Sequence, residues 1–407
     1  MEEIKAMRLQ ISNRCRSISP SPTLVIDSKA KAMKKKGIDV VGFGAGEPDF
    51  DTPEYIRNAA KAALDKGMTR YTPSSGTLEL RTAICEKLKR DNGLEYEPDQ
   101  IVVSNGAKHS LFNICQTILD PGDEVIIPEP FWVSYPELVQ IAGGVPVMVH
   151  GHEENDFLVS ADDMKPYITP RTKAIILNSP NNPNGCVWPR EMLEDIARLA
   201  VENQLFVISD EIYEKLVYDG EKHVSIASLG EEIKAQTFVV NGFSKAYAMT
   251  GWRLGYCAGP TNVMKAVGAL QSHATSNPNS IAQYAGYVAL SGGDDIIAAM
   301  VAEFDRRRKH IVSRINAIPG LSCRMPKGAF YVMMNISELI GAAQGDKVIR
   351  SSTDFAELLL ENAKVAVVPG LGFGSDMHVR LSYATSMENI DRGLDRIAQF
   401  VGSLRKA

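Results

Sequence analysis

Three polar side chains follow apolar, strand-like segments of the sequence. Asp210 is the last residue of one such segment, Asn182 lies in the loop after the preceding segment, and Lys245 lies in the turn after the next one. The carboxyl ends of parallel strands form the ligand crevice of α/β proteins. We therefore expect these three side chains to meet at a binding site.

Lys245 is not expected to be an ordinary solvent-exposed lysine, because it follows a buried strand in a turn rich in small residues. A desolvated lysine amine is nucleophilic and can form a Schiff base with a carbonyl compound. Pyridoxal phosphate is the cofactor that pairs such a lysine with an acid at its ring nitrogen, and Asp210 is placed to be that acid. A lone lysine is more often a solvated amine, so the hypothesis depends on the neighbouring residues.

Those neighbours suit a phosphate group. Ser244 and Arg253 flank Lys245 and offer a hydroxyl donor and a planar guanidinium. Gly106, Ala107 and Lys108 open a helix after another strand, where free amide groups and the positive end of the helix dipole favour an anion. Taken singly, a glycine there is more often a plain turn, and the arginine could form a surface ion pair.

The elements that must position these residues alternate between about residues 53 and 290, which is typical of an α/β domain. We expect helices over 53–66 and 188–203, with Thr52 capping the first and Pro53 at its first position. Seven short apolar segments predict a mostly parallel, seven-stranded sheet. These strands are predicted at 101–105, 124–128, 145–150, 173–178, 205–210, 237–242 and 254–259.

The pattern changes after residue 295, where a long charged helix precedes three short strand-like segments and a closing helix from 387. This indicates a smaller α+β domain. Residues 1–47 contain no complete core of their own, so we expect them to pack against it. The sequence thus predicts a large domain of residues 48–294 and a discontinuous small domain of residues 1–47 and 295–407.

Composition narrows the class of partner. The 407 residues are 44% hydrophobic and 23% charged, with 44 basic and 49 acidic side chains and a net charge of -5. This balance favours neither nucleic acid nor an anionic membrane, and it leaves a small molecule as the expected partner. The six cysteines lie far apart without a CxxC pair, so we expect neither a metal site nor disulfides. With no run of about 18 apolar residues and no apolar leader, we expect a cytoplasmic protein.

An ordered series of motifs covers nearly the whole chain, and through it the sequence resembles the fold-type I pyridoxal-phosphate aminotransferases, in their bacterial and plastid aspartate/prephenate branch. Asn184 departs from the family pattern, which usually has threonine there. The motifs are AGEPDFDTP (45–53), RYTPSSG (70–76), SNGAKHSLFN (104–113), PFWVSYPE (130–137), NSPNNPNG (178–185), SDEIYE (209–214), SKAYAMTGWRLGY (244–256), GAFY (328–331) and VRLSYATS (379–386).

The resemblance implies a role for each candidate. Lys245 would bond to the cofactor and then move the proton during amino transfer, while Asp210 would keep the ring nitrogen protonated. Tyr213 and Asn182 would hydrogen-bond the phenolic oxygen of the ring, and Trp132 would stack on its face. Trp132 and Asn182 would also contact the substrate.

The resemblance also implies how substrates bind. Arg380 would clamp the α-carboxylate with two hydrogen bonds, and the backbone of Gly46 would approach the same group. Lys108 would reach the distal carboxylate of an acidic substrate, with residues 19–23 closing over it. Tyr71 would cross from the partner subunit to the cofactor phosphate, which makes a homodimer with shared sites part of the expectation.

The activity implied is transfer of the amino group of L-aspartate, or another acidic amino acid, to 2-oxoglutarate. Conversion of prephenate to arogenate is an alternative in the same branch. A lyase on the same fold and the sensor half of a transcription regulator are further alternatives, although only about 47 residues precede the cofactor domain. Fold alone does not separate the enzymes, so the site must.

Overall fold

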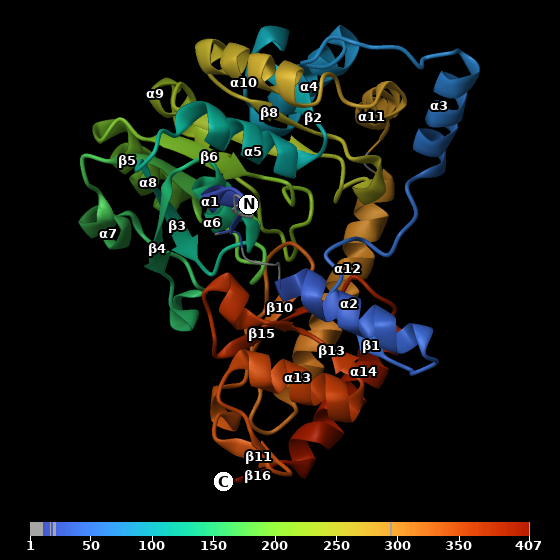
Figure 1. Ribbon diagram of the computed structural model, residues 1–407. Helices are drawn as coiled ribbons and strands as arrows, with labels where there is room; N and C mark the ends of the chain where they lie inside the picture. The colour runs from blue at the N-terminus through green and yellow to red at the C-terminus, as the bar shows by residue number, and fades with distance from the viewer. Residues whose placement is uncertain (1–10, 17, 19–21, 294, 407) are drawn as a thin grey trace, which may run out of the picture.

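A seven-stranded sheet forms the centre of the computed structural model, which describes residues 11–16, 18, 22–293 and 295–406 (Figure 1). Only β8 runs antiparallel to the other strands, so the predicted mostly parallel α/β sheet is confirmed. In spatial order the strands are β2 (Ile101–Ser104), β8 (Gly255–Ala258), β7 (Thr237–Gly242), β6 (Phe206–Asp210), β5 (Thr172–Asn178), β3 (Glu124–Glu129) and β4 (Val145–His150).

Helices cover both faces of this sheet, which explains why its strands are continuous apolar runs rather than alternating ones. One face packs against α5 (Ala107–Ile118), α6 (Ser134–Ile141) and α10 (Thr261–Ala274). The opposite face packs at one end against α3 (Glu54–Asp65), α4 (Leu78–Asn92) and α11 (Ser280–Ser291). At its other end that face packs against α7 (Ala161–Met164), α8 (Arg190–Glu202) and α9 (Glu231–Lys234).

The expected cap of α3 is wrong. The helix begins at Glu54, with Pro53 as its N-cap residue and no side-chain cap. The hydroxyl of Thr52 instead donates to the carbonyl of Ala248 (2.6 Å) and accepts from the indole N–H of Trp252 (2.9 Å). Thr52 therefore anchors the segment that follows Lys245.

A second, four-stranded antiparallel sheet lies beside the large one, in the order β14 (Val368–Pro369), β15 (His378–Ser382), β10 (Tyr331–Asn335) and β9 (Ser322–Cys323). Its core is shared with α12 (Asp295–Asn316), α13 (Ser352–Ala363) and α14 (Met387–Ser403). A small outer sheet is formed by β11 (Ala342–Gln344), β12 (Lys347–Val348) and β16 (Arg405–Lys406).

The amino-terminal segment joins these carboxy-terminal elements. β1 (Val41–Gly42) pairs in parallel with β13 (Val365–Ala366), and α2 (Pro22–Lys35) packs beside them, so blue and red segments lie together in Figure 1. The short helix α1 (Asn13–Arg16) differs from the expectation, because it lies against α6 beside the large sheet. Of the predicted lid over residues 19–23, positions 19–21 lie outside the described residues.

Among the described residues no single helix is long and apolar enough to cross a bilayer, and only α11 and α12 together, with an 85° bend between them, pass that test.

The junction of β8 with the start of α5 admits no extra atom at Gly255. A Cβ there would lie 2.3 Å from the amide nitrogen of Ala107 and 2.6 Å from the carbonyl carbon of Gly106. We expect Gly255→Ala to lower the free energy of unfolding by about 1–3 kcal/mol, because the backbone must shift. Urea unfolding measures this loss.

Gly42→Ala is the matched control, since a Cβ on this strand residue would meet no described atom within 4 Å. Equal unfolding midpoints for the two variants would contradict the close packing at Gly255.

Candidate active site

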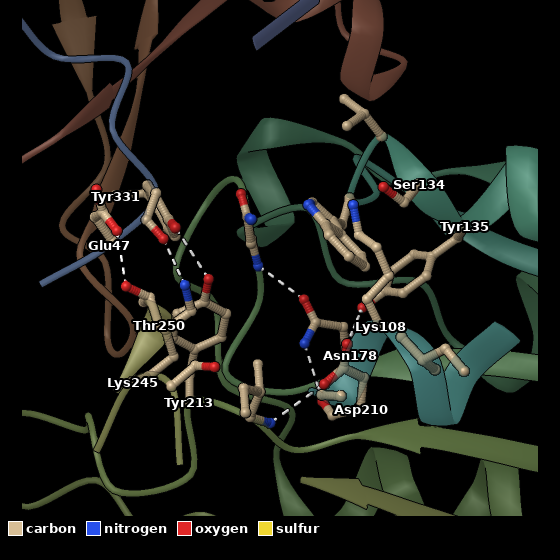
Figure 2. A pocket seen from close by; sticks show the side chains of 18 of the residues that line it. Glu47, Lys108, Ser134, Tyr135, Asn178, Asp210, Tyr213, Lys245, Thr250 and Tyr331 are labelled. Carbon is tan, nitrogen blue, oxygen red and sulfur yellow. Dashed lines mark hydrogen bonds between the residues drawn. The ribbon is translucent and has the colours of Figure 1, made fainter. Parts of the chain in front are cut away.

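A pocket of about 390 Å³ opens at the carboxyl ends of the large-sheet strands, where β10 and β15 of the second sheet face them (Figure 2). It brings together most of the residues singled out from the sequence. Those lining it are Gly46, Ala107, Lys108, Trp132, Asn182, Asp210, Tyr213, Ser244, Lys245, Arg253 and Arg380.

Lys245 lies in the turn after β7, largely shielded from solvent. Its ammonium group donates to the carbonyl of Gly46 and lies 5.6 Å from the ring centre of Tyr213. Burial lowers the pKa of Lys245 to about 8, against the opposing charges of Glu47 and Asp210. The amine can therefore lose its proton close to neutral pH, which a nucleophile or a base requires.

Asp210 ends β6 and is almost fully buried. One carboxylate oxygen accepts from the hydroxyl of Tyr135 (2.7 Å), and the other accepts from the amide of Ile212 (3.3 Å). Burial raises the pKa of Asp210 to about 6, although the hydrogen bond from Tyr135 opposes the rise. A buried carboxylate held only by neutral donors fits a cationic group, such as a protonated ring nitrogen, facing it.

An anion cradle lies at the start of α5. Gly106 precedes the helix with a φ of 88°, and a Cβ there would lie 2.6 Å from a terminal nitrogen of Arg253. Arg253 donates to the carbonyls of Thr250 (2.9 Å) and Asn105 (3.3 Å) rather than to a carboxylate. With the buried hydroxyl of Ser244 nearby, this donor set fits a phosphate group.

Lys108 follows this helix start, and its ammonium group lies 4.7 Å above the indole ring of Trp132. Burial lowers the pKa of Lys108, and the neighbouring charge of Arg253 lowers it further. An anion bound here would relieve both effects, because it would stabilise the charged amine.

Arg380 is buried in β15, with 2% of its surface exposed. It donates to the side-chain oxygen of Asn182 (2.9 Å) and to the carbonyl of Gly44 (3.0 Å). Its Nε has no partner among the described residues, and burial lowers its pKa. A buried guanidinium with only neutral acceptors fits a carboxylate ligand.

Of three further positions singled out from the sequence, Gly46 belongs to the pocket lining, whereas Tyr71 and Asn184 do not. Gly46 lines the pocket, where a Cβ would come within 3.2 Å of the hydroxyl of Tyr331. Tyr71 lies away from the pocket of its own chain, and 91% of its surface is exposed. Asn184 leaves its side-chain nitrogen buried without a partner in the described part of the chain, while its oxygen accepts from the amide of Cys186 (2.8 Å).

The sequence analysis missed several side chains of the pocket. Tyr135 reaches Asp210 from one side, and Tyr331 and Tyr213 share a hydrogen bond of 2.9 Å near Lys245 on the other (Figure 2). Thr250 donates to Glu47 (2.8 Å) at the same place. Tyr135 and Tyr331 lie within the motifs PFWVSYPE and GAFY, which carry the family resemblance. Their place in these motifs was the signal that could have identified them.

The donor set as a whole fits one group with three features: a phosphate, which the start of α5 would hold; an aromatic ring with a basic nitrogen, which Trp132 and Asp210 would hold; and an aldehyde, which Lys245 would bind. Pyridoxal phosphate has these features. The fit rests on Asp210, Arg253 and Lys245, which are charged side chains without a full counter-charge from the protein.

Comparisons with known proteins agree with this pocket. The family model of aminotransferase class I and II matches residues 38–397. The aspartate aminotransferase of Bacillus sp. (strain YM-2) is 50% identical over 97% of this chain and its own full length. A probable aspartate/prephenate aminotransferase of Aquifex aeolicus is 48% identical over 96% of this chain and 98% of its own length.

Solved structures show the same likeness. The aspartate aminotransferase of Rhizobium meliloti has a TM-score of 0.95 and 45% identity, over 98% of this chain and all of that one. The Thermus thermophilus enzyme with maleate has a TM-score of 0.91 and 45% identity, over 96% of this chain and all of that one. The chain belongs to the class I and II aminotransferases, and its fold is that of the fold-type I enzymes.

Proposed function

We propose that this protein transfers the amino group of L-aspartate to 2-oxoglutarate with pyridoxal phosphate held at Lys245. One observation carries the proposal: besides Lys245 and Arg253, which are assigned to the cofactor, the pocket contains a buried cation, Arg380, and an exposed one, Lys108, and no carboxylate of the described residues is bound to either. Two such cations suit a substrate with two carboxylates. The aspartate aminotransferase names of the relatives support the same reaction.

Bound pyridoxal phosphate supplies an electron sink for the pair left when the Cα–H bond of the amino acid breaks. Lys245 would hold the cofactor, and its amine, whose pKa is near 8, would serve as the base and acid that moves the proton. Asp210, kept in place by Tyr135, holds a proton on the ring nitrogen. Ser244, Arg253 and the start of α5, at Gly106 and Ala107, hold the phosphate.

Other side chains orient the reactants. Trp132 would pack on the ring face, and Tyr213 and Asn182 would donate to the ring oxygen. Arg380, with Gly46 beside it, binds the α-carboxylate, and Lys108 binds the distal one. Asn182 serves both groups, because its side-chain oxygen already accepts from Arg380.

We also propose the two-domain division at residues 48–294, with 1–47 and 295–407 as the small domain. The pairing of β1 with β13 supports it for the segment around residue 41, while α1 lies against α6 of the large domain. The exposure of Tyr71 supports a homodimer in which this side chain reaches the cofactor phosphate of the other subunit. A cytoplasmic location is proposed with them.

Formation of arogenate from prephenate is the second candidate, because several relatives carry aspartate/prephenate in their names. Turnover of aspartate with 2-oxoglutarate, measured beside turnover of glutamate with prephenate, separates the two activities. Release of pyruvate or ammonia without glutamate would indicate a lyase instead.

Lys245 is expected to carry the cofactor. Borohydride reduction followed by peptide mapping should place the pyridoxyl mass on Lys245, because its amine combines burial with a pKa near 8 beside Asp210. Lys245→Ala should abolish turnover and keep the far-ultraviolet circular dichroism of the parent. A pyridoxyl mass on Lys108, the other lysine of the pocket, would show the assignment to be wrong.

Lys108 is expected to select acidic substrates. A hydrogen bond to a charged group contributes about 1.5–3 kcal/mol, so Lys108→Ala should lower kcat/KM for aspartate roughly 10- to 150-fold. Turnover of alanine, which has no distal carboxylate, is the control and should change far less. Equal losses for both substrates would mean that Lys108 serves the cofactor or the fold.

Asp210 should destabilise the cofactor-free protein at neutral pH. Its pKa in the folded state is about 6, above the usual 3.8 of an aspartate side chain, so the protonated form is favoured by folding and stability falls as pH rises from about 4 to 6. Asp210→Asn should therefore raise the free energy of unfolding at pH 7 by up to roughly 3 kcal/mol, which urea unfolding measures. The gain should disappear below pH 4.

The matched variant is Tyr135→Phe, which removes the hydrogen bond that holds the pKa of Asp210 down. It should move the pH window of destabilisation upward. A constant stability difference between Asp210→Asn and the parent from pH 4 to 8 would refute the titration of Asp210.

A further inference from the structure

Glu153 of the large domain contacts the small domain outside the pocket lining. It lies in the short helix η2 (Glu153–Asn155), in the loop after β4 of the large domain. One of its carboxylate oxygens accepts from the side-chain nitrogen of Asn335 (2.5 Å) and contacts Nε2 of His378 (3.1 Å). Asn335 and His378 are directly opposite each other in the β10–β15 ladder. One carboxylate of the large domain thus holds both members of a terminal strand pair of the small domain.

His378 is firmly fixed on the small-domain side. Only 7% of its side chain is exposed, and its Nδ1 lies 2.8 Å from the hydroxyl of Ser375. The ring of Phe157, from the same loop as Glu153, packs edge-on against the imidazole at 5.3 Å. Movement of Glu153 would therefore be transmitted to β15 rather than absorbed by a loose side chain.

Two routes lead from His378 to Arg380. The first is the strand itself: the residues are two apart in β15, so both side chains lie on the same face of the sheet. The second is the turn η7 (Gly370–Phe373), where a Cβ on Gly370 would lie 2.2 Å from the carbonyl oxygen of His378. The ring of Phe373, at the end of this turn, lies 5.0 Å from the guanidinium of Arg380.

We propose that Glu153 is a positioning residue for Arg380: by holding the Asn335–His378 pair against the large domain, it sets where the guanidinium stands in the pocket. The inference rests on the proposed role of Arg380 as the ligand of the substrate α-carboxylate. Glu153 itself does not line the pocket and so acts only through Arg380.

A second contact between the same segments makes a matched control. Arg324 of the small domain binds the carboxylate of Asp156 at 2.8 Å, but 48% and 45% of these side chains are exposed. Exposed pairs of this kind contribute little. Asp156 has a φ of 54°, which asparagine tolerates, so Asp156→Asn removes this ion pair without straining the backbone.

The test uses the cofactor-loaded enzyme and succinate, a dicarboxylate that does not react. Glu153→Ala should raise the Kd for succinate and the KM values for aspartate and 2-oxoglutarate roughly 10- to 100-fold. The reason is that the guanidinium of Arg380, which binds the carboxylate of these molecules, is displaced by a fraction of an ångström or more. The kcat should change less than about 3-fold, and the cofactor absorbance spectrum should not change.

Glu153→Gln keeps an oxygen that accepts from both partners, so it should restore succinate affinity to within about 3-fold of the parent. Asp156→Asn should match the parent. In an Arg380→Lys background, Glu153→Ala should add little, since the two residues act on one interaction. If Glu153→Ala does not fold, Asn335→Ala removes one of the two donors and gives the same test.

The outcomes separate the two proposals. If Arg380→Lys weakens succinate binding and Glu153→Ala does not, or if the two losses simply add, the positioning role is overturned while the carboxylate site stands. If Arg380→Lys leaves succinate affinity unchanged, the proposed role of Arg380 is wrong and the positioning role falls with it.

Discussion

The site depends on the burial of three ionisable side chains, Lys245, Arg380 and Asp210, in one pocket where their hydrogen bonds within the described part of the chain go to neutral groups. Burial lowers the pKa values of Lys245 and Arg380 and raises that of Asp210, in each case toward the neutral form. Their partners are dipoles: carbonyls of Gly44 and Gly46, the hydroxyl of Tyr135 and the amide of Asn182. Such an arrangement is stabilised when a ligand of complementary charge enters.

A neighbouring cluster shows what full pairing looks like. Glu214 lies a short distance along the chain from Asp210 and is also buried, but it is bound by the ammonium of Lys87 and the amide of Asn92. Burial raises the pKa of Glu214, yet these partners outweigh it and lower the pKa to about 2. The charge of Glu214 is therefore paired with Lys87, and this pair connects α4 to the loop after β6. The carboxylate of Asp210 has no such partner among the described residues and can interact with a cationic group in the pocket.

The sheet, and the meeting of Asn182, Asp210 and Lys245 in one pocket, could be predicted because strands buried on both faces are plain apolar runs, and the residues after them meet at one edge. Contacts between distant segments could not. The sequence around Thr52 predicts a helix cap, but its hydroxyl forms hydrogen bonds with Ala248 and Trp252, about two hundred residues away. Tyr135 looks like one more aromatic residue of an amphipathic helix until α6 is placed beside β6 and its hydroxyl meets Asp210.

The position of Arg380 shows why the discontinuous arrangement of the chain matters for chemistry. Its two bonded acceptors come from the amino-terminal segment and from the loop after β5, while its own strand lies near the carboxyl end. Side chains alternate along a strand, so a shift of one residue in the β10–β15 register would turn the guanidinium out of the pocket. β1 pairs in parallel with β13, and Phe43 packs within the same core. These contacts position Gly44 so that its carbonyl accepts the hydrogen bond from Arg380. The proposed carboxylate site therefore exists only when three separate parts of the chain have assembled, and on this proposal substrate affinity depends on the packing between those parts as well as on the pocket.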